Sequence, residues 1–371
     1  MAAALICIFF LLCTAGITAS AANAGEDAQA TLEESIGQLY EAIDRETEKA
    51  LESIGITDGS FTELSDLSPR LVITALLDLL TGAAVQPLKS AGLICLFLVL
   101  GSVTDIFTEK QGSAGAIFSL FGLLWVLLSV LPPLTDAFSA ALSAIRLGAD
   151  FLLAYIPVFA GVVAMSGQPL LSAAYSSVMV GLSNVIAAVN GKVLLPLIQG
   201  SLLLHVVSVL QEKHSLADLA AFLKKTAQTA LAFGAALFTG LLTLKGTLAA
   251  SGDSLAVRGV KMAVGAAVPV IGGTLSEAYT SVLGSFSLIR NTVGVFGIVV
   301  LLLMHLPSIL ALLLWYFALS FAAALGGALG QETAKKLLEG IAGAVALLNV
   351  FLLFHAFLLV ISTGVILQFK G

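Results

Sequence analysis

Apolar segments of about twenty residues recur along most of this chain, and they constrain its fold more than any other feature. A segment of that length crosses the hydrocarbon core of a bilayer as a helix. The sequence predicts nine such spans, at residues 89–107, 115–133, 150–166, 169–189, 193–210, 226–244, 291–306, 307–329 and 341–367. We therefore expect an all-α, polytopic membrane helix bundle of about eight to ten spans, preceded by a short amphipathic helical segment.

A further segment, 263–285, is long enough to span but contains one proline, several glycines and a glutamate. Because such a segment makes a poor lipid-facing helix, we interpret it as re-entrant or interfacial, with a tenth span as the alternative. The choice decides on which side Lys335, Lys336 and the C-terminus lie. The positive-inside rule places the 211–225 loop in the cytoplasm but is violated by the basic 245–262 connector, so it does not settle the question.

The composition agrees with a lipid environment. Apolar residues make up 58% of the chain and charged residues 11%, with a mean hydropathy of +1.05. A soluble domain carries about 45–50% apolar and about 25% charged residues. The 17 Lys and Arg against 23 Asp and Glu give no basic footprint for nucleic acid. These values exclude an ordinary cytosolic enzyme, a disordered protein and a nucleic-acid binder.

The acidic charge is confined to one short segment. Residues 25–70 hold 12 acidic and 3 basic side chains, whereas residues 71–371 hold 11 acidic and 14 basic ones. Residues 1–24 are uncharged, with an apolar stretch and an Ala-Asn-Ala end that predict a cleaved signal peptide. No Lys or Arg precedes the apolar stretch, so an uncleaved anchor is the alternative. Cleavage would place residues 25–87 outside the cytoplasm, ahead of a multi-pass domain at 88–371.

The acidic segment has helical periodicity. Residues 31–54 predict one amphipathic helix that starts at a capping box formed by Thr31 and Glu34, and Ser68-Pro69 predicts the start of a second helix. Two interpretations remain open for this segment. It is either a surface helical hairpin lying on the membrane portion or a docking surface for a partner outside the cytoplasm.

Small residues predict close helix packing. The ladder of Ala322, Gly326 and Gly330 lets two helices approach closely, and Gly294 with Gly297 and Gly340 with Gly343 add further small faces. Several prolines lie in or beside spans, as in transporters whose broken helices line a cavity. For most of these positions we prefer the simpler explanation that Gly and Pro are common in membrane helices.

Catalytic and metal-binding motifs are not found in the sequence. His205, His305 and His355 lie singly in different spans, His214 lies in a loop, and none has metal-ligand spacing with a carboxylate. Serine- and aspartyl-protease patterns and phosphate-binding loops also fail to match. We expect no enzyme activity, no cofactor and no metal.

Ionisable residues inside a bilayer are costly, so each one requires an explanation. Few are present, which argues against a proton- or ion-coupled pump and leaves a passive pore, a scaffold or one subunit of an assembly. The polar, glycine-rich segment 251–290 is the candidate pore or functional segment, with Arg258, Lys261, Pro269, Gly272, Gly273, Glu277 and Arg290 as its candidate residues.

Three stretches resemble a known family. They are SGDSLAVRGVKMAVGAAVPVIGGTLSEAYTSVLGSFSLIRNTVGVFGIVVL at residues 251–301, LLAYIPVFAGVVAMSG at 152–167 and PLIQGSLLLHVVSVLQEKHSLADLAAFLKK at 196–225. In order and spacing over roughly residues 85–368, the chain resembles stage III sporulation protein AE of endospore-forming bacteria. Residues 25–70 resemble the family only in general character.

The resemblance implies a polytopic subunit of the apparatus that connects mother cell and forespore. It implies a pore or scaffold role, the mother-cell membrane as location, and other stage III sporulation membrane proteins as partners in an oligomeric complex. It implies no catalytic residues. An independent small-solute permease is the alternative that the prolines in the spans favour.

Overall fold

The computed structural model describes residues 26–57, 63, 69–107, 113–189, 195–211, 214–267 and 272–368. Within these ranges the chain is helical and contains no strand. Its helices, in chain order, are α2 (Glu26–Tyr40), α3 (Arg45–Ser53), α5 (Pro69–Phe107), α6 (Ser113–Met165), α7 (Pro169–Val189), α8 (Leu195–Gln211), α9 (His214–Ala267), α10 (Gly272–Ala328) and α11 (Glu332–Gln368). The expected all-α helix bundle is confirmed.

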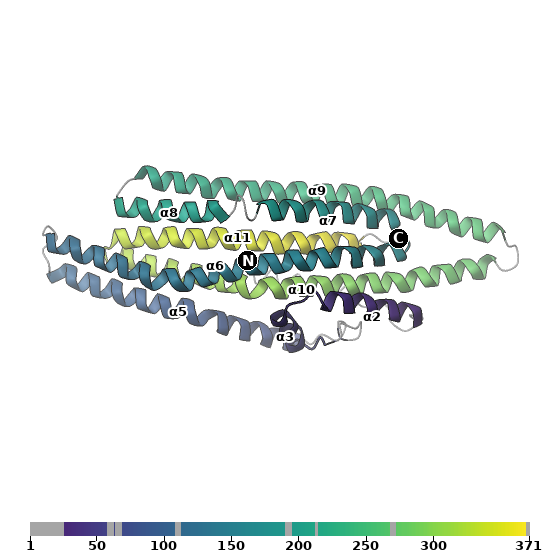
Figure 1. Cartoon of the computed structure of the whole chain (residues 1–371), viewed down its shortest axis with the longest axis horizontal. Helices are drawn as coiled ribbons and strands as arrows, with labels where there is room; N and C mark the ends of the chain where they lie inside the picture. Colours follow the sequence, from purple (N-terminus) through teal and green to yellow (C-terminus); the bar gives the residue numbers. More distant parts are fainter. Residues whose placement is uncertain are drawn as a thin grey trace.

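The long helices lie side by side along one axis (Figure 1). Helix α9 forms one edge of the bundle, and α5 with α2 and α3 forms the opposite edge, while α6, α10 and α11 lie between them. Helices α7 and α8 follow one another along a single line beside α9. The predicted signal peptide at 1–24 falls outside the described residues.

Several helices are much longer than one membrane crossing. Helices α6, α9 and α10 have 53, 54 and 57 residues, or about 80–85 Å at 1.5 Å per residue, against about 30 Å of hydrocarbon. Predicted spans 115–133 and 150–166 are therefore parts of the single helix α6, and 291–306 and 307–329 are parts of α10. Five helices are long and apolar enough to cross a membrane, namely α5, α6, α9, α10 and α11.

The prolines do not break these helices. Pro132, Pro133 and Pro157 lie inside α6, and Pro307 lies inside α10. Each proline removes one backbone hydrogen bond, and neighbouring helices in a bundle compensate for that loss. The same holds at Pro87 inside α5. The domain boundary expected at 87/88 thus falls within a continuous helix.

The segment 263–285 contains the end of α9 and the beginning of α10, at one tip of the bundle (Figure 1). Its described residues belong to two long helices, because α9 runs to Ala267 and α10 runs from Gly272 to Ala328. The turn between α10 and α11, with Lys335 and Lys336 close after it, lies at the other end of the bundle (Figure 1). These lysines share an end of the bundle with Lys224 and Lys225 of α9.

The acidic N-terminal segment forms two helices where the sequence predicted one. The carboxylate of Asp44 accepts hydrogen bonds from the backbone N–H groups of Glu46 and Thr47 at 3.1 and 3.3 Å, which starts α3 as a new helix. Thr31 lies inside α2, which already begins at Glu26, so the predicted capping box is wrong. The start of the following helix at Pro69 is confirmed.

The apolar face of α2 and α3 is buried within the chain. Ile36, Leu39 and Leu51 belong to the same core cluster as residues of α6 and α10, and the Tyr40 ring lies 5.3 Å from the Phe296 ring of α10. This face is therefore covered by the bundle, as expected for a surface hairpin. Only its acidic side faces outward.

The interior of the bundle is filled by large side chains and glycine contacts. Trp315, Tyr155 and Tyr175 are among its largest fully buried residues. A Cβ on Gly297 of α10 would lie 2.2 Å from Tyr155 Cε2, so the two helices are too close for any larger residue there. A Cβ on Gly340 of α11 would overlap the His205 ring of α8 in the same way.

The predicted small-residue ladder lies at the end of α10. Ala322 is fully buried, and a Cβ on Gly326 would lie 3.6 Å from Leu98 of α5 and from the Lys335 backbone N. Gly330 has φ +76° and follows the last turn, where its N–H bonds to the Gly327 carbonyl. A Cβ there would meet no atom within 4 Å, so Gly330 serves the backbone conformation that ends α10.

Candidate functional site: a polar cluster at the α6–α7 turn

The chain reverses direction at Ser166–Gln168, between α6 and α7, and a buried polar cluster surrounds this turn. Gly167 has φ +85°, and its N–H bonds to Ala164 O while the Gln168 N–H bonds to Val163 O. This is the Schellman arrangement, in which a left-handed residue, usually glycine, ends a helix. The end of α6 is therefore determined by a local signal, the glycine of Ser166-Gly167.

Asp253 of α9 caps the first turn of α7 from 83 residues away. Its two carboxylate oxygens accept hydrogen bonds from the backbone N–H groups of Leu170 and Leu171, at 3.0 and 2.8 Å. The first N–H groups of a helix have no partner within the helix, and a negative charge there interacts favourably with the helix dipole. The cap comes from another helix because the residue before Pro169 is Gln168, whose side chain is engaged elsewhere.

Arg290 of α10 holds that glutamine. Arg290 Nη1 donates a hydrogen bond of 2.6 Å to Gln168 Oε1, and both side chains are at most 3% exposed. A buried guanidinium is tolerated only where polar groups surround it. Because Arg290 binds Gln168 and Asp253 binds Leu170 and Leu171, two opposite charges lie in the same buried region.

The cluster joins α6, α7, α9 and α10 at one height of the bundle. A Cβ on Gly252 would lie 2.8 Å from Leu170 Cδ1, so α9 also approaches α7 closely beside the cap. The hydrogen bonds of Asp253 and Arg290 hold these helices together at this height. The cluster connects α9 and α10 to the beginning of α7, at the point beyond which α9 and α10 extend toward the tip.

The predicted candidate residues are distributed around this cluster. Arg290 belongs to it, Arg258 is exposed on α9 and Lys261 is half-buried on α9, one to two turns nearer the tip. Gly272 and Gly273 begin α10, and Glu277 follows in its second turn. Pro269 lies outside the described residues. Among the predicted residues whose side chains the structure describes, Arg258, Lys261 and Arg290, only Arg290 belongs to the buried cluster.

Asp253 and Gln168 were missed by the sequence analysis. Asp253 was assigned to a loop because 245–262 was interpreted as a connector, whereas α9 is helical throughout this stretch. The neighbouring residues, Ser251-Gly252-Asp253-Ser254, are typical of a loop, which explains that interpretation. The partner of Asp253 in α7 could not be inferred from the sequence, because the contact joins distant segments.

A second polar feature lies deeper in the bundle, where His305 of α10 meets His355 of α11. His305 Nε2 lies 2.8 Å from His355 Nδ1, and His305 Nδ1 lies 2.7 Å from the Leu301 carbonyl. A carbonyl only accepts, so the neutral His305 donates from Nδ1 and accepts at Nε2. The two residues were expected to lie singly. They are instead packed together and hydrogen-bonded to one another.

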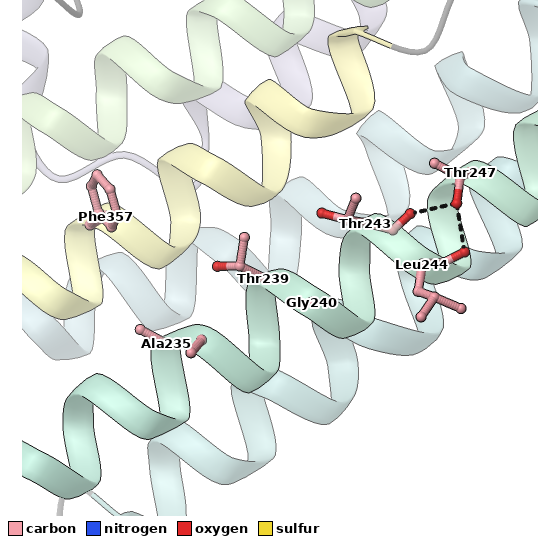
Figure 2. A pocket seen from close by; sticks show the side chains of 8 residues that line it. Ala235, Thr239, Gly240, Thr243, Leu244, Thr247 and Phe357 are labelled. Atoms are coloured by element: carbon pink, nitrogen blue, oxygen red, sulfur yellow. Dashed lines mark hydrogen bonds between the residues drawn. The ribbon is translucent and has the colours of Figure 1, made fainter.

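A shallow groove of about 720 Å³ runs along α9 beside Phe357 of α11 (Figure 2). Thr239, Thr243 and Thr247 line it at one-turn spacing. The Thr247 hydroxyl donates to the carbonyls of Thr243 and Leu244 in its own helix, as the dashed lines in Figure 2 show. No charged residue is among the residues that line this groove.

Within the described ranges, no group of three or more His, Cys, Asp and Glu is placed to hold a metal ion. The polar features of these helices are the cluster at the α6–α7 turn, the histidine pair and single side-chain bonds to carbonyls. One such bond joins His205 Nε2 of α8 to the Lys336 carbonyl of α11 at 2.8 Å. Another runs from Gln331 Nε2 to the Leu98 carbonyl of α5 at 3.0 Å.

Comparison with known proteins gives one family. Residues 62–369 match the stage III sporulation protein AE family. The chain is 28% identical to stage III sporulation protein AE of Bacillus subtilis (strain 168) over 277 residues, which cover 73% of this chain and 69% of that protein. No solved structure matches the chain.

The matched region includes α5 to α11 and therefore the whole bundle with its polar cluster. All three stretches that carried the resemblance lie inside it, and two of them, 152–167 and 251–301, meet at the α6–α7 turn. The family is described by a stage of sporulation and not by a reaction. The chain belongs to the stage III sporulation protein AE family.

Proposed function

We propose that this chain is an integral membrane subunit of the channel or secretion-like apparatus between mother cell and forespore. It acts there as a pore or scaffold component, together with other stage III sporulation membrane proteins, in the mother-cell membrane that faces the forespore. Family membership supports the sporulation role. The five long apolar helices support the membrane location.

The observation that carries the pore-or-scaffold role is the filled interior of the bundle. Its centre, α10 and α11 with their neighbours, is occupied by buried aromatic and aliphatic side chains in two core clusters. Interiors packed in this way exclude water. A single copy therefore offers no lumen through its described core, and a pore would form between copies or with partners.

The same observation separates this proposal from an independent permease. That alternative relied on proline-broken spans, and α6 and α10 run through their prolines without interruption. Purified protein reconstituted alone into liposomes should release no trapped small solute above the level of empty liposomes. Solute-selective flux by the chain alone would support the permease instead.

The distribution of charge supports one orientation. Lys224, Lys225, Lys335 and Lys336 lie toward the end of the bundle that holds the α10–α11 turn, and cytoplasmic ends of membrane proteins carry such residues. The acidic α2 and α3 and the α9–α10 tip would then lie outside the cytoplasm. We retain the proposal of a signal peptide at 1–24, an extracytoplasmic segment at 25–87 and a membrane domain at 88–371, with α5 continuous through 87/88.

We assign the functional segment to 251–290, the tip and its attachment to the bundle. Gly272→Leu and Glu277→Ala should lower the yield of heat-resistant spores in the organism that encodes the chain, while membrane insertion stays intact. Gly181→Ala, on α7 where a Cβ would meet no atom within 4 Å, is the control. Wild-type spore yield from both variants at normal protein level would overturn the assignment.

A further inference from the structure

Helix α9 carries an exposed row of residues with heptad spacing. Its members alternate at intervals of four and three residues, and all are exposed; they are Leu237, Leu241, Leu244, Leu248, Ser251, Leu255, Arg258 and Met262. Leu248, Leu255 and Met262 are 68%, 70% and 76% exposed. A 3–4 apolar repeat over nearly four heptads is the pattern of a helix that pairs with another helix. We call this row the α9 seam.

The charges beside the α9 seam are basic. Lys245, Arg258 and Lys261 lie on it or flank it, whereas the acidic residue in this stretch, Asp253, is buried under α7. In a parallel pair of two α9 helices Arg258 would face its own copy, because it occupies a seam position. Like charges at such positions disfavour that pairing. The α9 seam therefore fits an acidic surface better than a second α9.

An acidic surface lies on the opposite edge of the same molecule. Residues 26–57 hold nine acidic and two basic side chains, and the apolar side of α2 and α3 is buried against α6 and α10. Six exposed glutamates remain on the outside, namely Glu33, Glu34, Glu41, Glu46, Glu48 and Glu52. We call these six residues the acidic face. Figure 1 shows α2 and α3 at the edge opposite α9.

The two surfaces lie at the same height along the bundle. Asp253 of α9 and Arg290 of α10 both bind the α6–α7 turn, so they are level with one another. Leu248 lies five residues before Asp253 in α9, and Phe296 lies six residues after Arg290 in α10. Because the two helices are antiparallel, both residues are displaced away from the α9–α10 tip, by about 8–9 Å at 1.5 Å per residue. Tyr40 of α2 contacts Phe296, so α2 is level with Leu248.

We propose that the acidic face of one copy binds the α9 seam of a second copy of this chain. The contact joins two different surfaces, so it is heterologous and repeats from copy to copy. Because both surfaces lie at one height and on opposite edges, successive copies stay level and form a row of parallel bundles. This inference rests on the proposed function, to which it adds a second copy of the chain as a partner. Cross-linking measures the contact independently of spore yield.

Site-directed cross-linking tests this contact. In a chain whose Cys7, Cys13 and Cys95 are replaced by alanine, Gln38→Cys on α2 and Leu248→Cys on α9 are produced with different tags in the same membranes. Gln38 is exposed beside the acidic face. Oxidation or a short bifunctional thiol reagent should give dimers containing both tags, and the double variant should give a ladder of larger species.

Each single variant alone should give no cross-linked dimer. Leu153→Cys on α6, with 57% exposure similar to that of the seam, is the matched control and should give none with Gln38→Cys. Dimers from Leu248→Cys alone would mean that α9 pairs with α9. Absence of the mixed dimer, with both variants inserted at wild-type level, would mean that lipid or another protein covers the seam. Either result overturns the proposal.

Charge reversal supplies a second readout. Arg258→Glu with Lys261→Glu should lower the yield of the mixed dimer by roughly fivefold. Adding Glu33→Lys with Glu34→Lys on the partner copy should restore it. If the yield of the mixed dimer is the same in both sets of charge-reversal variants as in the original pair, electrostatic pairing of these surfaces is contradicted. If cross-linking fails while spore yield depends on the chain, the proposed function stands and the self-contact is wrong.

Discussion

At the scale of single residues, the bundle depends on a few buried polar groups and on glycines that allow close approach. Asp253 and Arg290 are ionisable groups inside the protein; Asp253 binds the first turn of α7, and Arg290 binds Gln168 just before it. Their positions explain why charged residues occur in otherwise apolar helices. Removing one of them leaves backbone or side-chain groups without partners, which is costly in a buried site.

Asp253→Ala should lower the stability of the protein, because the N–H groups of Leu170 and Leu171 lose both acceptors. We expect a loss of about 1–3 kcal/mol in the free energy of unfolding. The midpoint of thermal unfolding in detergent measures this loss. Asp253→Asn keeps one carbonyl acceptor and should lose less than alanine does. Equal midpoints for Asp253→Ala and the exposed-site control Asp136→Ala would contradict the capping role.

Gly148→Ala should also destabilise the bundle. A Cβ on Gly148 of α6 would lie 2.4 Å from His305 Cε1 and 3.4 Å from His355 Cε1, so the histidine pair must move. Overpacking of this kind costs about 1–3 kcal/mol. Gly161→Ala is the matched control in the same helix, because a Cβ there meets no atom within 4 Å. Equal unfolding midpoints for the two variants would contradict the close contact at Gly148.

At the scale of helices, the chain ends its elements with local signals that the sequence displays. Pro69 starts α5, Asp44 starts α3, and glycines with positive φ end α3, α6 and α10 at Gly55, Gly167 and Gly330. Helix continuity is less visible. The apolar stretches of α6 are separated by Asp136, Arg146 and Asp150, which read as a connector although the helix continues through them.

Gly330→Ala should destabilise the α10–α11 turn, because an L-residue is strained at φ +76°. We expect a loss of more than about 1 kcal/mol. The same substitution at Gly181, in the middle of α7 and with open space around its Cβ, should be neutral or stabilising, since alanine favours helix. The unfolding midpoint of Gly330→Ala should therefore fall, while that of Gly181→Ala should stay the same or rise. A similar shift for both would contradict the assigned conformation.

The fold class could be predicted from the sequence, and the partners of buried residues could not. Periodicity and hydropathy are properties of neighbouring residues, so they reveal helices and spans. The bonds from Asp253 to α7 and from Arg290 to Gln168 join residues 83 and 122 positions apart. The histidine pair is likewise formed only when α10 and α11 pack. Such contacts depend on the order in which helices are arranged in space.

At the scale of the whole molecule, the bundle has two chemically different ends. The acidic α2 and α3, the polar cluster and the α9–α10 tip gather toward one end, and the α10–α11 turn with its lysines lies at the other (Figure 1). A filled core lies between them. A chain of this kind can anchor in a membrane and present its tip to partners, which is the central claim of the proposed function.

Cysteine accessibility in intact cells tests that claim most directly. Ala256→Cys on the exposed side of α9 near the tip and Lys336→Cys at the start of α11 are placed singly in the cysteine-free chain. A membrane-impermeant maleimide should label Ala256→Cys in intact cells and Lys336→Cys only after the membrane is permeabilised. Labelling of both positions from the same side, or of Lys336→Cys alone from outside, would contradict the orientation and the role of the tip.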